Sequence, residues 1–204
     1  MLRQLVECFQ DRVELPIEIE EIRDSIVNLG IQDKIVFSAE DLDTGTLRGA
    51  LYQWRESAGV YTDPVWTTLI VYPVNETIER QRVICAKELI HLFDAQVVRT
   101  NTPEMVEQLA KKVVGPFETP STNPSDLMAS MDKLAQYQSL NLLLPLAARR
   151  LARKKIEAGE VDMAQVSEWA AIPIEETVLV LNDHWDKFSE LLIAIGNGEM
   201  VVPD

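Results

Sequence analysis

The sequence predicts an α+β fold that is mainly helical, with a small β-sheet and a helical C-terminal segment. Runs rich in β-branched and aromatic residues lie between residues 34 and 72, and such runs are typical of strands. On either side of this region, apolar residues recur at intervals of three and four, as they do on one face of a helix. The composition, 47% hydrophobic and 25% charged, is that of a soluble globular protein.

The N-terminal part of the chain predicts two helices followed by the strands. Residues 1–29 have helical spacing that Pro16 interrupts, and the second of the two helices ends at Gly30. The strands are expected at residues 34–38, 49–54 and 66–72, of which the last has the clearest pattern.

The rest of the chain predicts helices almost throughout. A helix over residues 78–95 has apolar residues on most of its circumference, so we expect it to be buried on most sides. A helix over 102–114 and a proline-rich loop over 115–125 follow. Ser125 then caps a helix to about Leu144, and Pro145 breaks the chain. The last helices are expected at residues 146–158, 161–170 and 174–188.

The charge and the N-terminus limit the classes of partner and the location. The net charge of −14 repels nucleic acid, so we expect protein or small-molecule partners. No apolar run reaches the roughly 20 residues that span a membrane, and the N-terminus lacks the apolar region of a signal peptide. Cys8 and Cys85 are far apart and fit no metal or redox spacing. We therefore expect a cytoplasmic protein with no membrane segment.

The expected helix over 78–95 contains a modified metallopeptidase motif, Lys87-Glu88-Leu89-Ile90-His91. In the usual motif, H-E-x-x-H, two histidines four residues apart share one helix face and bind zinc, and the glutamate is the general base. Glu88 and His91 are in register with that motif, but Lys87 occupies the position of the first histidine.

Three separated segments resemble, in their order and spacing, the ImmA/IrrE family of metallopeptidase-like proteins. The first is the strand at 69–72, which leads into a helix start that contains arginine at residues 80–82. The second is residues 87–93. The third is Leu-Leu-Leu-Pro at 142–145, which is similar to the L-L-M-P that ends the helix carrying the family's third zinc ligand.

The resemblance covers roughly residues 30–182 and implies a fold and a domain division. It implies a zincin-like domain over residues 1–145, followed by a helical extension over residues 146–204 that packs on it. The overall prediction is thus a mainly helical zincin-like domain with a small sheet and a helical C-terminal segment.

The resemblance also implies a role for each residue of the candidate site. His91 matches the second histidine ligand, and Glu88 matches the general base of an active enzyme. Asp132 lies nearest to the third ligand position, where the family has a glutamate that is one methylene longer. Lys87 departs from the pattern at the first ligand position. Asp94, one turn after His91, is a further ligand candidate that the family pattern does not include.

A lysine is a poor substitute for a zinc ligand. Its ammonium group, with a reference pKa of about 10.4, has no lone pair to donate near neutral pH. His91 and Asp132 alone would bind zinc weakly, because catalytic sites usually keep three protein ligands. No cofactor is therefore expected, and zinc is expected only if the site functions. One hypothesis places the Lys87 ammonium where the metal would be, paired with Glu88 or Asp132. The alternatives are a Lys87–Glu88 pair on the surface and a His91 that is simply a hydrogen-bonded core residue.

The resemblance favours a regulatory or protein-binding module without peptidase activity, of phage or mobile-element type, whose partner is a repressor-type regulator. The alternative is an active zinc-dependent endopeptidase that cleaves such a repressor.

Two further interpretations concern the C-terminal part. Residues 161–181 have a faint helix-turn-helix rhythm, and a basic run from Arg149 to Lys155 precedes them, but Glu175 and Glu176 at the second helix would repel phosphate. Nucleic-acid binding is therefore disfavoured, and a solvated helix face is the simpler interpretation of the basic run. The apolar residues Leu191, Leu192, Ile193 and Ile195 are either core or a contact in a homo-oligomer.

Overall fold

The structure is a computed structural model that describes residues 1–42, 48–56, 64–94 and 124–199, with only the backbone described at 124–129. Within these residues the fold is α+β, with eight α-helices and a small mixed sheet. The elements in chain order are α1 (Leu2–Phe9), α2 (Ile19–Asn28), β1 (Lys34–Glu40), β2 (Ala50–Glu56), β3 (Val65–Pro73), α3 (Ile78–Ile90), the 3-10 helix η1 (His91–Phe93), α5 (Pro124–Leu143), α6 (Leu146–Glu157), α7 (Met163–Ala170), α8 (Ile174–Val180) and α9 (Trp185–Gly196).

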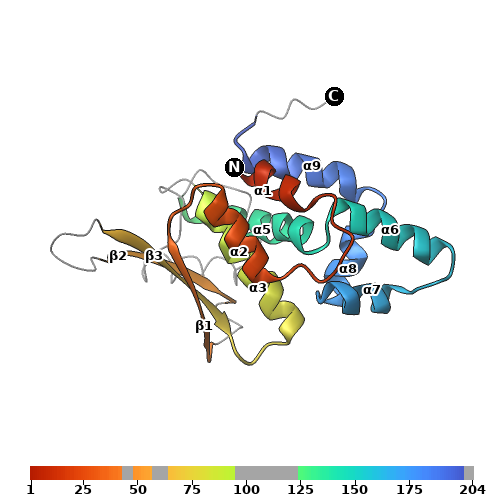
Figure 1. The fold of residues 1–204 in the computed structure, drawn as a ribbon, viewed down its shortest axis with the longest axis horizontal. Coiled ribbons are helices and arrows are strands. Elements are labelled where there is room, and N and C mark those ends of the chain that lie inside the picture. The colour runs from red at the N-terminus through yellow and green to blue at the C-terminus, as the bar shows by residue number, and fades with distance from the viewer. Residues whose placement is uncertain (43–47, 57–63, 95–123, 200–204) are drawn as a thin grey trace.

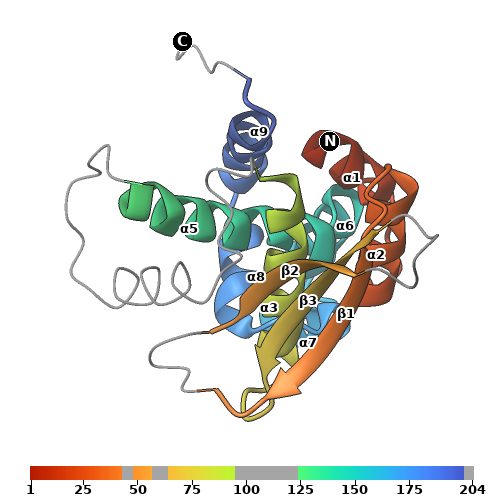
Figure 2. The same cartoon turned by 90° about the vertical axis from the view of Figure 1, so that its left-hand side faces the viewer.

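The sheet has three strands in the order β1-β3-β2, with β1 parallel and β2 antiparallel to the central strand β3. Phe37, Ile70 and Leu51 are direct cross-strand partners, and all three pack into the hydrophobic core. Figure 1 shows the sheet at one side of the molecule and the helices at the other, and Figure 2 shows α3 behind the sheet. One face of the sheet therefore covers the helix that carries the motif.

Helix α3 is the central element of the fold. Its N-cap Thr77 accepts a hydrogen bond from the backbone N–H of Arg80, as side chains of this type commonly do at helix starts. Every residue from Val83 to Ile90 is buried, which confirms the expectation of a helix covered on most sides. Helix α3 contacts β3, α2 and α5, so the charged residues of its last turn lie inside the protein.

The C-terminal helix α9 packs against both α5 and α1, and the N-terminus lies beside α9 in Figure 1. The side chain of Gln138 on α5 donates a hydrogen bond of 2.7 Å to the backbone oxygen of Leu192. At Gly196 a Cβ atom would lie 2.5 Å from both Gln138 Nε2 and Leu2 Cδ2. Any larger residue at position 196 would therefore have to displace the side chains of Gln138 and Leu2.

Two expectations about the C-terminal helices need correction. The single helix expected at 174–188 is two helices, because α8 ends at Val180 and α9 begins at Trp185. Arg153, on α6, donates hydrogen bonds to the backbone oxygens of Val180, Leu181 and Asn182, which ties the end of α8 to a distant helix. The helix expected to start after Ser125 begins at Pro124.

The remaining expectations are settled in part. Leu192 and Ile193 are buried in the core, whereas Leu191 and Ile195 are exposed. A contact in a homo-oligomer therefore remains a prediction for Leu191 and Ile195 alone among these four residues. The helix expected at 102–114 and the loop expected up to residue 123 lie outside the described residues. Among the helices that the structure describes, none is long and apolar enough to cross a membrane.

Candidate functional site

The fold brings all four residues of the predicted site together. Lys87 and Glu88 lie in the last turn of α3, and His91 begins η1 directly after it. Asp132 lies on α5, 45 residues further along the chain than Lys87, and reaches the site because α5 packs against α3.

Lys87 forms a buried ion pair with two carboxylates. Its Nζ atom lies 2.6 Å from Asp132 Oδ1 and 2.9 Å from Glu88 Oε1. The side chains of Lys87 and Glu88 are only 9% and 5% exposed, so the alternative of a surface pair is wrong. Lys87 thus pairs with both Glu88 and Asp132, which the sequence predicted as alternative partners.

His91 uses its two ring nitrogens for two different carboxylates. Nδ1 lies 2.6 Å from Asp94 Oδ2, and Nε2 lies 3.5 Å from Asp132 Oδ1. Asp94 therefore contacts the nitrogen that faces away from Asp132. In this position Asp94 orients the imidazole ring, as outer carboxylates do for histidines at many sites, rather than joining Asp132 on the same side.

The pKa values of the cluster favour its charged forms. For Lys87, burial would lower the pKa, but the charges of Asp132 and Glu88 outweigh burial and raise it. For Asp132, burial would raise the pKa, but the charge of Lys87 and the hydrogen bond with His91 bring it well below its usual range. For His91, burial would again lower the pKa, but the hydrogen bonds with Asp132 and Asp94 raise it to about 9. At neutral pH the cluster holds an ammonium and an imidazolium among carboxylates.

The charges on Lys87 and His91 oppose the binding of a zinc ion at these residues. A metal ligand needs a free lone pair, which the Lys87 ammonium lacks; at His91, whose pKa is raised to about 9, a proton competes with a metal for the ring nitrogen. The Lys87 ammonium also lies against Asp132 Oδ1, the oxygen that faces His91 Nε2. In the described part of the chain, no group of three or more histidine, cysteine, aspartate or glutamate side chains is arranged to hold a metal.

Gly49 is a residue of the site that the motif did not reveal. It comes directly before β2, and a Cβ atom there would lie 2.8 Å from Glu88 Oε1 and 2.6 Å from Ile84 Cγ2. Glu88 Oε1 is buried and has no hydrogen-bond donor among the described residues, and it lies 2.9 Å from the Lys87 ammonium. The motif gives no signal for this position, because Gly49 lies in a different part of the chain and its approach to Glu88 is set by the fold.

Arg82, in the segment that carries the family resemblance, joins three parts of the chain. Its guanidinium donates hydrogen bonds to Glu18 and to the backbone oxygens of Ile17 and Ala171. Ala171 ends α7 with a φ of 49°. Arg82 therefore connects the motif helix α3 to the N-terminal region and to the turn between α7 and α8.

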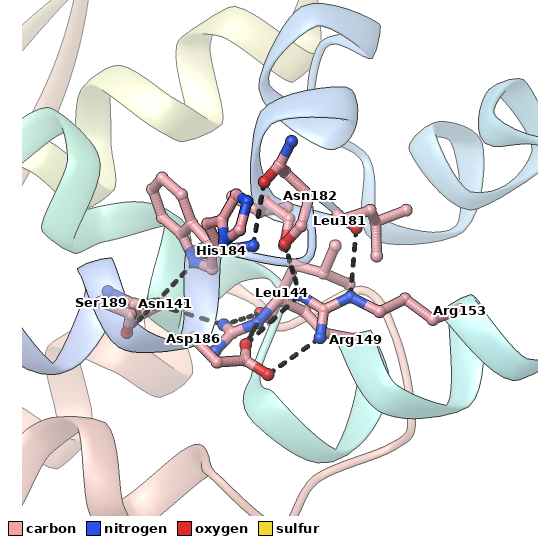
Figure 3. A network of polar contacts seen from close by, with 11 residues as sticks. Asn141, Leu144, Arg149, Arg153, Leu181, Asn182, His184, Asp186 and Ser189 are labelled. Atoms are coloured by element: carbon pink, nitrogen blue, oxygen red, sulfur yellow. Dashed lines mark hydrogen bonds and ion pairs between the residues drawn. The ribbon is translucent and has the colours of Figure 1, made fainter.

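The basic run from Arg149 to Lys155 is largely an internal structural feature. Figure 3 shows Arg149 bonded to Asn141, Leu144 and Asp186, and Arg153 bonded to Asp186 and the end of α8. Burial lowers the pKa of Arg149 to about 10, although Asp186 partly opposes this effect.

Little of the basic run remains for an external partner. Lys155 pairs with Glu160, so Arg150 and Lys154 are the members of the run without an ion-pair partner among the described residues. This arrangement removes most of the positive charge on which the nucleic-acid alternative depended.

Comparison of the chain with models of known protein families, with curated proteins and with solved structures gives no match.

Proposed function

We propose that the chain is an ImmA/IrrE-like protein with a zincin-like fold, in which an internal ion pair has replaced the zinc site. It acts as a regulatory module that binds a protein partner and has no peptidase activity. The observation that carries this proposal is the 2.6 Å ion pair between Lys87 Nζ and Asp132 Oδ1, which joins the first ligand position of the motif to the expected third one.

The chemistry of the cluster supports a site without catalysis. A general base must be free to take a proton from a bound water, but Glu88 faces the Lys87 ammonium at 2.9 Å and is almost wholly buried. The ion pair between Lys87 and Asp132 also holds α3 against α5, so the cluster stabilises the fold without zinc. The resemblance supplies the setting: the partner is a repressor-type regulator of a phage or mobile element.

The zinc content of purified variants tests this proposal. The protein is purified without chelator as wild type, His91→Ala, Lys87→His, and Lys87→His combined with His91→Ala, and zinc is measured by mass spectrometry. We expect little zinc in the wild type, near-stoichiometric zinc in Lys87→His, and loss of that zinc in the double variant. The reason is that Lys87→His restores a neutral ligand and removes the competing cation.

Two results would contradict the proposal in different ways. Stoichiometric zinc in the wild type that is lost in His91→Ala would favour the zinc-dependent endopeptidase, with Glu88 as general base and His91 and Asp132 as ligands. No zinc in Lys87→His, in a variant that is folded by circular dichroism, would contradict the zincin-like geometry itself.

A further inference from the structure

Helix α8 presents an apolar surface to solvent. Ile174 and Val178 are 40% and 51% exposed, and Leu179 is 39% exposed. Ile174 and Val178 are four residues apart, as are Glu175 and Leu179, and such pairs are neighbours on a helix surface. Ile174, Glu175, Val178 and Leu179 thus form one continuous surface, here called the α8 face.

The stretch of sequence that contains the α8 face is strongly acidic. Between Lys155 and Lys187 the sequence contains no lysine or arginine. The same stretch contains eight carboxylates, of which Glu160 pairs with Lys155, and Asp186 pairs with Arg149 and Arg153. The other six form no ion pair with a described residue: Glu157, Asp162, Glu168, Glu175, Glu176 and Asp183. An apolar surface bordered by one sign of charge attracts a partner of the opposite sign and repels one of the same sign.

The arginines that border α8 are occupied by internal contacts. Arg82 is bonded to Glu18, Ile17 and Ala171 at the start of the turn before α8. Arg153 is bonded to Asp186 and to backbone oxygens at the end of α8. Neither arginine is thus available to neutralise Glu175 on the α8 face.

The α8 face is held in place by the core beneath it. Thr177 and Val180, on the opposite side of α8, are buried. Helix α7 packs against α8 and begins with a capping box between Asp162 and Gln165, a stabilising helix start. Figure 1 shows α7 and α8 together on the side of the helical layer away from β2. A partner would therefore meet a preformed surface.

We propose that the α8 face binds a basic amphipathic helix of a partner protein. The apolar side of such a helix would cover Ile174, Val178 and Leu179, and its lysines and arginines would meet Glu175 and the neighbouring carboxylates. Helix-on-helix recognition of this kind places apolar residues at intervals of three and four against an apolar surface. Nucleic acid and anionic membranes have the wrong charge for this surface.

The α8 face is separate from the Lys87 cluster, and its role does not depend on the proposed loss of zinc. The α8 face can fail to bind a partner while the zinc measurements agree with the proposed function. Equally, the zinc measurements can contradict the proposed function while the α8 face binds its partner.

A designed peptide tests the proposal. The probe is a fluorescein-labelled helical peptide with leucines on one side and lysines and arginines on the other, and binding is followed by fluorescence anisotropy. The variant Glu175→Lys with Val178→Lys is compared with Glu40→Lys with Val36→Lys. Val36 and Glu40 are exposed residues of β1, which lies apart from α8 in both overall views, so the control makes the same change of residue types and net charge elsewhere.

We expect the α8 variant to bind the probe at least about tenfold more weakly than the wild type, and the β1 variant to bind within about twofold of it. A probe with serine in place of leucine should lose most of the affinity. Equal weakening in both variants would show that binding depends on the net charge of the protein and not on the α8 face, and would overturn the proposal. No detectable binding of the probe to the wild type would also overturn it. Sedimentation of the protein alone gives a further test. A dimer that only the α8 variant abolishes would assign the face to a second copy of the chain and would also overturn the proposal.

Discussion

At the scale of single residues, Lys87 shows how the type of one side chain decides the chemistry of a buried site. A histidine at this position would offer a lone pair, whereas the lysine brings a positive charge that Asp132 and Glu88 must balance. Two charges taken out of water are costly, and the cost is recovered only when each charge meets its partner. The cluster is therefore stable as a set and sensitive to the loss of any one member.

This dependence leads to a prediction for the variant Lys87→Met, which keeps much of the side-chain volume but removes the charge. Asp132 and Glu88 would remain buried without their cation, so we expect a loss of about 3–5 kcal/mol in the free energy of unfolding. Urea denaturation measures this loss. Combining Lys87→Met with Asp132→Leu should recover part of the loss, because one unpaired carboxylate is removed.

A matched control separates burial from charge in this experiment. Lys155 pairs with Glu160, but both side chains are well exposed, so Lys155→Met should change the free energy of unfolding by less than about 1 kcal/mol. A small effect of Lys87→Met, equal to that of Lys155→Met, would contradict the buried ion pair.

At the scale of elements, local sequence patterns predicted most helices and strands, and long-range contacts set the exceptions. The strand expected at 66–72 is β3, and the buried helix expected from residue 78 is α3 followed by η1. Both depend on β-branched or apolar spacing within a short stretch. The end of α8 could not be predicted because the backbone oxygens there are bound by Arg153 from another helix.

The candidate site likewise combines residues that the sequence predicted with contacts that only the folded structure shows. The spacing of the motif gave Lys87, Glu88 and His91, and the resemblance placed Asp132 beside them. The close approach of Gly49 to Glu88 and the use of the second His91 nitrogen by Asp94 depend on side-chain directions in the folded protein. A linear sequence does not contain those directions.

The network between α6 and α9 gives a prediction for pH dependence. For Asp186, burial would raise the pKa, but the hydrogen bond from Arg153 and the charge of Arg149 lower it. A carboxyl group whose pKa is lower in the folded state contributes stability above its unfolded pKa of about 3.9, and that stability is lost as the pH falls through the folded value. Asp186→Asn should therefore destabilise the protein by about 1–2 kcal/mol at pH 7 and by less near pH 3.

Urea unfolding of the wild type and Asp186→Asn at both pH values checks this prediction. Asp183→Asn, three residues earlier and exposed, is the control and should change stability little at either pH. A difference between wild type and Asp186→Asn that stays constant from pH 7 to pH 3 would show that the ion pairs of Asp186 contribute no stability.

At the scale of the whole molecule, the two ends of the chain share one core. Leu2, Leu142 and Leu192, from α1, α5 and α9, belong to the same buried cluster. The division expected at residue 145 would pass through this cluster. The proposed zincin-like domain would then end in a helix, α5, whose buried polar groups find their partners beyond the division.

The fragment of residues 1–145 should therefore fail to fold on its own. Without the C-terminal helices, Gln138 loses the backbone oxygen of Leu192, and Asn141 loses its donors Arg149, Trp185 and Ser189. The apolar side of α5 would also be exposed to water, at about 25 cal/mol per Å². Circular dichroism and urea unfolding should show no cooperative transition for the fragment, whereas the whole chain should unfold in one transition. A fragment that unfolds cooperatively would mean instead that residues 1–145 are an independent domain, and that α9 covers a core that is already complete.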